Sequence, residues 1–170
     1  MNARVLWAEP LNAGAFAPYG DVIDIDAARR SFAINDGGAL RHDDLARVDV
    51  HEAGGQGAVA IVRAQPVRLP VRLRALERHQ MGSQLFVPMQ LARFLVVVAR
   101  HDSAHPFAEA RCFIALPGQG VQFSRGTWHH PLLALDAMTD FVVVDRCEPS
   151  GAEDCDLRRW DDAPDADVRP

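Results

Sequence analysis

Short runs of apolar residues, or of alternating apolar and polar residues, fill most of the chain from Gly57 onward and are separated by glycine and proline. Such runs between turn residues are typical of β-strands, and no long segment repeats its apolar residues with the helical period of about 3.6. The pattern predicts strands over residues 58–63, 67–79, 85–88, 93–98, 111–116, 121–123 and 140–145. Many short strands without intervening helices predict an all-β fold, and we expect a jelly roll, or double-stranded β-helix, with a few short helices.

The two ends of the chain carry mixed signals. Near the N-terminus we expect a strand around residues 4–7, a brief helix that Asn12 caps and Pro18 ends, and a second strand over 21–25. The segment from Glu148 is rich in Asp, Pro and Arg, so we expect one short helix near residues 156–160 and a flexible tail from about residue 161.

Composition narrows the class of partner. The 170 residues fit a single domain with a core of its own, and 48% hydrophobic and 24% charged residues are ordinary values for a globular protein. A net charge of −5 with scattered arginines argues against a nucleic-acid surface. The longest apolar stretch, residues 94–99, is too short to span a membrane, and the N-terminus lacks the apolar region of a secretory signal. We therefore expect a cytoplasmic protein with a small-molecule partner.

The predicted strand over residues 67–79 ends in two polar residues on its apolar face. Side chains alternate between the two faces of a strand, so Glu77 and His79 continue the row of apolar odd-numbered positions. The even-numbered positions, which we expect to face solvent, include Arg68, Arg72, Arg74 and Arg78. An ionised carboxylate needs a partner when it is buried, so Glu77 should meet a cation, a metal or hydrogen-bond donors.

A turn rich in Gly and Pro, over residues 117–131, presents two adjacent histidines, His129 and His130. Gln84 begins the next strand after Glu77 and His79, and we expect it to return to the same end of the barrel. Imidazole, carboxylate and amide ligands together suit a divalent transition metal. The candidate catalytic residues are Glu77, His79, His129 and His130, and the candidate metal ligands are Glu77, His79, Gln84 and one of His129 and His130. The alternative is a hydrogen-bonded structural Glu–His pair and an ordinary histidine-containing turn.

Two arginines can hold a carboxylate group of a ligand. Arg63 ends the predicted strand over 58–63, and Arg125 lies beside the histidine turn. Asn35 lies in an Asn-Asp-Gly-Gly segment whose composition alone indicates only a turn. With Gln84, these residues form the candidate substrate-binding set.

Several segments together resemble the ureidoglycolate lyases of allantoin catabolism, over about residues 11–146. The segments that carry the resemblance are Ala15-Phe16-Ala17-Pro18-Tyr19-Gly20-Asp21-Val22-Ile23, Ile34-Asn35, Arg63-Ala64-Gln65-Pro66, Leu76-Glu77-Arg78-His79, Gly82-Ser83-Gln84, Pro117-Gly118-Gln119-Gly120-Val121, Arg125-Gly126-Thr127-Trp128-His129-His130-Pro131 and Val143-Val144-Asp145-Arg146.

The resemblance implies a single cupin-like domain over residues 1–170, a homodimer, and cleavage of (S)-ureidoglycolate to glyoxylate and urea. It also implies a divalent metal, with nickel favoured and a metal-free site as the alternative. Glu77, His79 and Gln84 fall at the first cupin motif, where Glu77 replaces a histidine, and His129 falls at the histidine of the second. The chain departs from the family near His42, where relatives tend to carry an aromatic residue and then a histidine after the arginine.

Two functional hypotheses follow. In a lyase, Glu77 or His79 would take the hydroxyl proton, His129 or His130 would supply or position a proton for departing urea, and Arg63 or Arg125 would hold the carboxylate. In the alternative, a non-catalytic cupin binds a small 2-oxo or 2-hydroxy acid as a sensor. Urea release distinguishes the two.

Overall fold

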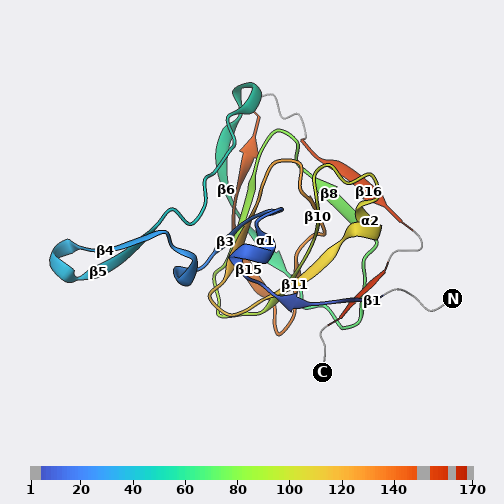
Figure 1. Ribbon diagram of the computed structural model, residues 1–170, viewed down its shortest axis with the longest axis horizontal. Coiled ribbons are helices and arrows are strands. Elements are labelled where there is room, and N and C mark those ends of the chain that lie inside the picture. Colours follow the sequence, from blue (N-terminus) through green and yellow to red (C-terminus); the bar gives the residue numbers. More distant parts are fainter. Residues whose placement is uncertain (1–4, 149–153, 161–163, 168–170) are drawn as a thin grey trace.

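Two β-sheets face one another in the computed structural model, which describes residues 5–148, 154–160 and 164–167. Among these residues, one sheet has seven strands in the order β16 (Asp156–Arg159), β8 (Ala75–Arg78), β13 (Trp128–His129), β10 (Phe94–Ala99), β11 (Arg111–Ala115) and β2 (Glu9–Pro10), with β14 (Leu133–Ala134) also pairing with β10. The other has five strands in the order β3 (Gly20–Ile23), β12 (Gly120–Phe123), β9 (Gln84–Pro88), β15 (Thr139–Cys147) and β6 (Gln56–Ala64). The fold is the predicted all-β, cupin-like jelly roll (Figure 1).

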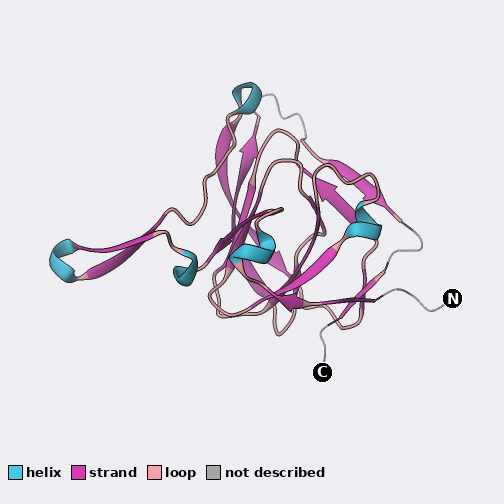
Figure 2. Ribbon diagram, in the orientation of Figure 1, coloured by secondary structure: helices cyan, strands magenta, loops and turns pink. Residues whose placement is uncertain are grey.

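Helices are few and short in the described part of the chain (Figure 2). They are α1 (Ala13–Phe16), α2 (Pro106–Glu109) and the 3₁₀ turns η1 (Ile25–Ala27), η2 (Asn35–Gly37) and η3 (Glu52–Gly54). The predicted cap of α1 is confirmed, since the Ala15 amide donates to Asn12 Oδ1 at 2.9 Å. No helix among the described residues is long and apolar enough to cross a membrane.

The core has two layers, one on each side of the seven-stranded sheet. Phenylalanines such as Phe94, Phe113 and Phe141 fill the space between the two large sheets. On the outer side, Leu76 and Trp128 belong to a second buried cluster. β10 is therefore buried on both faces, which explains why its sequence is continuously apolar instead of alternating.

A small third sheet helps to cover that outer side, and it overturns one expectation about the C-terminus. β17 (Asp165–Asp167) lies between β1 (Val5–Trp7) and β7 (Val71–Arg72), with Ala166 fully buried. The expected flexible tail is therefore wrong for these residues, while 161–163 and 168–170 lie outside the described residues. The expected helix near 156–160 is also wrong, because this segment forms β16 and pairs with the edge of β8.

The predicted strand over residues 67–79 is broken into β7 and β8. Leu73, between them, and Leu76, in β8, are both fully buried, so the alternation does not continue in one register. Arg78 is not turned to solvent as expected, because its guanidinium lies 4.4 Å from the centre of the Trp128 ring. The prediction that Glu77 faces the interior is confirmed, since Glu77 lines the cavity described below.

One hairpin stands away from the two-sheet body (Figure 1). It consists of β4 (Arg30–Ile34), η2 and β5 (Ala39–Asp43), and within the described residues these two strands pair only with each other. Leu40 on this hairpin is 61% exposed.

Candidate active site

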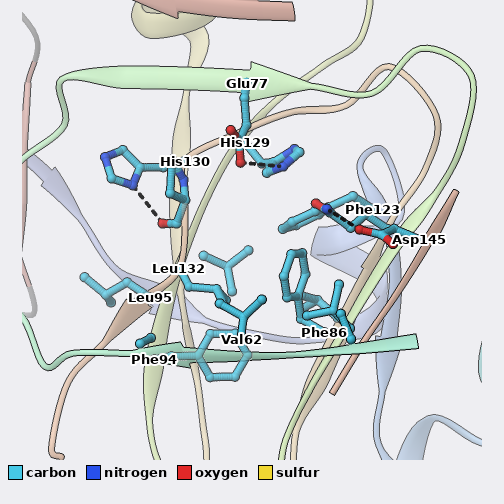
Figure 3. A pocket seen from close by; sticks show the side chains of 17 residues that line it. Val62, Glu77, Phe86, Phe94, Leu95, Phe123, His129, His130, Leu132 and Asp145 are labelled. Atoms are coloured by element: carbon cyan, nitrogen blue, oxygen red, sulfur yellow. Dashed lines mark hydrogen bonds and ion pairs between the residues drawn. The ribbon is translucent and has the colours of Figure 1, made fainter. Parts of the chain in front are cut away.

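A cavity of about 340 Å³ lies between the two large sheets and is mostly apolar. Phenylalanine, valine and leucine side chains form its walls, and five polar residues reach it (Figure 3). These five are Glu77, Gln84, His129, His130 and Asp145. An apolar pocket with a few polar groups is the usual form of a small-molecule site.

Glu77, His79 and His129 form a cluster beside this cavity, and their potential ligand atoms all lie within 4.8 Å of one another. Strand pairing brings them together, because Glu77 on β8 is the direct cross-strand partner of His129 on β13. His129 Nε2 lies 3.5 Å from Glu77 Oε1, and the two histidine rings are 5.5 Å apart. Three of the four predicted metal ligands therefore meet at one point.

Backbone carbonyls fix the tautomers of both histidines. His129 Nδ1 donates to the Thr127 carbonyl at 3.0 Å, and His79 Nδ1 donates to the Asp154 carbonyl at 2.5 Å. A carbonyl oxygen only accepts, so in each neutral ring the Nε2 atom carries the lone pair. His129 Nε2 is buried and has no hydrogen-bond partner among the described residues.

The electrostatics of the cluster favour a cation. Contact with His129 holds the pKa of Glu77 below its ordinary value, with further contributions from His79 and His130, so Glu77 is ionised at neutral pH. An ionised carboxylate facing an imidazole lone pair is unfavourable unless a proton or a metal ion lies between them. The Nε2 atoms of His79 and His129, whose Nδ1 atoms are held by backbone carbonyls, fit a divalent transition metal together with the Glu77 carboxylate.

His130 lines the same cavity but does not join the cluster. Its Nδ1 donates to the Pro131 carbonyl at 2.8 Å. Burial lowers the pKa of His130, so this imidazole is neutral at neutral pH. Of the two adjacent histidines, His129 therefore faces the cluster and His130 forms part of the wall.

Gln84 and Asp145 form a second polar pair in the cavity. Gln84 Nε2 donates to Asp145 Oδ2 at 3.3 Å, from neighbouring strands β9 and β15 of the five-stranded sheet. Asp145 was not predicted as a site residue. A signal was present, because Phe141, Val143 and Asp145 alternate along β15, so that the carboxylate ends an apolar face, as Glu77 does.

Comparison with known proteins identifies the family of this chain. The family model for ureidoglycolate lyase matches residues 3–164. This chain belongs to the ureidoglycolate lyase family. A relative named ureidoglycolate lyase from Burkholderia cepacia is 48% identical over 146 residues, which cover 85% of this chain and 81% of that protein.

A second relative with the same name, from Brucella melitensis biotype 2, is 44% identical over 154 residues, which cover 91% of this chain and 88% of that protein. A solved dTDP sugar isomerase from Desulfovibrio desulfuricans G20 aligns with a TM-score of 0.45 and 16% identity, over 85% of this chain and 87% of that one. That likeness is too weak to support an argument. Membership of the ureidoglycolate lyase family thus rests on the family model and the sequence relatives.

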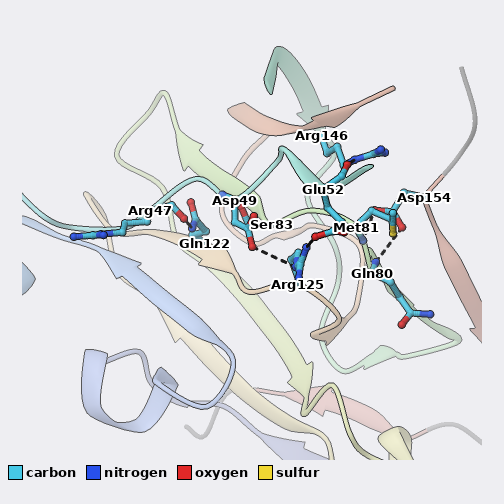
Figure 4. Close-up of polar contacts among 10 residues, drawn as sticks. All are labelled: Arg47, Asp49, Glu52, Gln80, Met81, Ser83, Gln122, Arg125, Arg146 and Asp154. Atoms are coloured by element: carbon cyan, nitrogen blue, oxygen red, sulfur yellow. Dashed lines mark hydrogen bonds and ion pairs between the residues drawn. The ribbon is translucent and has the colours of Figure 1, made fainter. Parts of the chain in front are cut away.

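Three of the predicted substrate-binding residues lie outside the cavity of this ureidoglycolate lyase family member. Arg63 is on the opposite face of β6 from the cavity-lining Val62 and Ala64, and Asp140 holds its guanidinium at 2.7 and 2.9 Å. Arg125 pairs with Glu52 at 2.8 Å (Figure 4). Asn35 begins η2, which joins the two strands of the projecting hairpin.

His42, near which the chain departs from the family pattern, is also on this hairpin. Its Nδ1 lies 2.9 Å from Ser31 Oγ. The structure thus keeps both Asn35 and His42 away from the cavity of their own chain.

Asp154 and Cys155, which were not predicted as site residues, also contact the cluster or its neighbours. Besides its carbonyl contact with His79, Asp154 accepts hydrogen bonds through its carboxylate from the backbone amides of Gln80 and Met81, at 3.0 and 2.7 Å. Cys155 Sγ lies 3.9 Å from Glu77 Oε2. Nothing local in the sequence signals these contacts, because they join positions more than 70 residues apart.

Proposed function

We propose that this chain is a ureidoglycolate lyase that cleaves (S)-ureidoglycolate into glyoxylate and urea, a reaction of allantoin degradation. The observation that carries the proposal is the convergence of Glu77, His79 and His129 beside an apolar cavity. Family membership and relatives that bear this name support the same reaction.

The reaction needs one proton to leave the substrate and one to return. The carbon that bears the hydroxyl also bears the ureido nitrogen, so loss of the hydroxyl proton forms a carbonyl as the carbon–nitrogen bond breaks. The Glu77 carboxylate, ionised beside His129, accepts the hydroxyl proton. The protonated Glu77 carboxyl group then gives this proton to the departing nitrogen, so the cluster ends in its starting state.

A divalent metal is part of the proposal, with nickel favoured by the family resemblance. Glu77, His79 and His129 would hold it, and it would polarise the substrate hydroxyl and lower the pKa of that group. The Thr127 and Asp154 carbonyls orient the two imidazoles. The ring of Phe123 stacks on His129, with 4.4 Å between centroids, and forms part of the apolar wall.

The first test is product formation. Purified protein is incubated with racemic ureidoglycolate, untreated, after chelation, and after addition of nickel or manganese, while urea and glyoxylate are measured against the spontaneous background. We expect both products, lost on chelation and restored by metal. Product without a metal response would leave acid–base catalysis alone, and no product above background would favour the non-catalytic binding protein.

We also propose that two copies of the chain associate through the side that carries the hairpin. A two-stranded hairpin is marginally stable by itself, and an edge strand as long as β6 is normally covered. Val59 and Ile61 on β6 are 75% and 63% exposed, and Figure 1 draws β6 and the hairpin on the same side of the molecule. In such a dimer, Asn35 could act only at the site of the neighbouring copy.

Leu40→Asp tests this association, since it replaces an exposed apolar side chain of the hairpin by a charged one. Light scattering after size exclusion should give a dimer mass for the parent protein and a shift toward monomer for the variant. Leu91→Asp, at a residue 84% exposed and outside the hairpin, should leave the mass unchanged. A monomeric parent protein would contradict the proposal.

A further inference from the structure

The Gln84–Asp145 pair consists mainly of hydrogen-bond acceptors, namely the two Asp145 carboxylate oxygens and Gln84 Oε1, and it lines the cavity. We infer that this pair is the subsite for the ureido group, which it recognises through the ureido N–H donors. The inference rests on the proposed substrate and assigns one end of it to a named place in the cavity.

The orientation of the Gln84 amide follows from its partner. A carboxylate only accepts hydrogen bonds, so the amide nitrogen must face Asp145, and the amide oxygen is left on the other side. Gln84 Oε1 is buried and has no hydrogen-bond partner among the described residues. A buried acceptor without a hydrogen bond is unfavourable, so a ligand that donates to it gains affinity.

The pair lies close to the catalytic cluster. Gln84 is the direct cross-strand partner of Phe123, whose ring stacks on His129 with 4.4 Å between centroids. Figure 3 draws Asp145 on the Phe123 side of the cavity and Glu77 beyond His129. A small ligand can therefore reach both the pair and the cluster.

The charge of the pair sets the orientation of the substrate. No arginine or lysine lines the described part of the cavity, and Asp145 repels a second carboxylate. Terminal NH₂ and internal N–H groups are donors that match the Gln84 and Asp145 oxygens. The ureido end is thus directed to β9 and β15, and the hydroxyl-bearing carbon to the Glu77 cluster.

Binding of two analogues tests the assignment without any need for turnover. N-carbamoylglycine keeps the ureido group but lacks the hydroxyl group, so it cannot collapse to an aldehyde. N-acetylglycine replaces its terminal NH₂ by a methyl group. By calorimetry on the metal-loaded protein we expect the ureido compound to bind about 10-fold or more tightly, because a hydrogen bond to a charged group is lost in the other.

Asp145→Asn should reduce this preference to about 3-fold or less, and Gln84→Met should reduce it as well. The matched control is Asp140→Asn, on the same strand but paired with Arg63 outside the cavity, which should keep the full preference. A preference unchanged in both Asp145→Asn and Gln84→Met, with both variants folded by circular dichroism, would overturn the subsite. Preference without urea release would instead reject the lyase and keep the subsite.

Discussion

Replacing His79 with alanine should lower kcat/KM for ureidoglycolate by about 10²- to 10⁴-fold, a loss as large as that of one acid–base group. His79 supplies one of three converging ligand atoms and stabilises the ionised form of Glu77. Its side chain is only half-buried and is not among the residues that line the cavity. The His79→Ala protein should therefore fold, with a melting temperature close to that of the parent, while losing bound metal along with activity.

The matched control is His105→Ala, which removes an exposed imidazole outside the cluster. This variant should keep its activity and its metal content. Steady-state kinetics, metal analysis and thermal melting of the three proteins give the comparison. Near-full activity in a folded His79→Ala protein would remove His79 from the catalytic set.

The order of apolar, polar and turn-forming residues along the chain was enough to predict several strands of the two large sheets. Glycine or proline lies beside several strands of the two large sheets, such as β6 and β9. The inward position of Glu77 was predicted from the alternation of side chains, although the row of apolar odd-numbered positions is broken between Leu73 and Leu76. The same rule, applied to β15, would have identified Asp145.

Other features depend on pairing between distant segments, which one sequence does not display. β16 and β17 are short and polar, and they are strands because β8, β1 and β7 offer them free edges. Arg63 and Arg125 looked available for a substrate, yet Asp140 and Glu52 occupy them across 77 and 73 residues of chain. Sequence alone therefore overestimated the number of substrate-binding cations.

Replacing Gly20 with alanine should destabilise the protein more than any exposed substitution, by about 4 kcal/mol or more. Gly20 has a φ of +152°, which side-chain-bearing residues rarely adopt. An added Cβ would also lie 1.8 Å from the Gln122 carbonyl oxygen and 3.0 Å from the Ser124 amide nitrogen. Both are backbone atoms of the segment that Gly20 joins, so relief requires β3 and β12 to separate.

This separation would reach the site, because Gly20 pairs with Phe123, whose ring supports His129. Urea denaturation should therefore show a lower midpoint for Gly20→Ala, and activity should fall in the fraction that remains folded. Gly37→Ala measures the cost of the backbone conformation alone, because the φ of Gly37 is +88° and nothing lies within 4 Å of the added Cβ. That control should cost about 1 kcal/mol. Equal midpoints for the two variants would mean that the strands can part without loss, contrary to the close packing of β3 on β12.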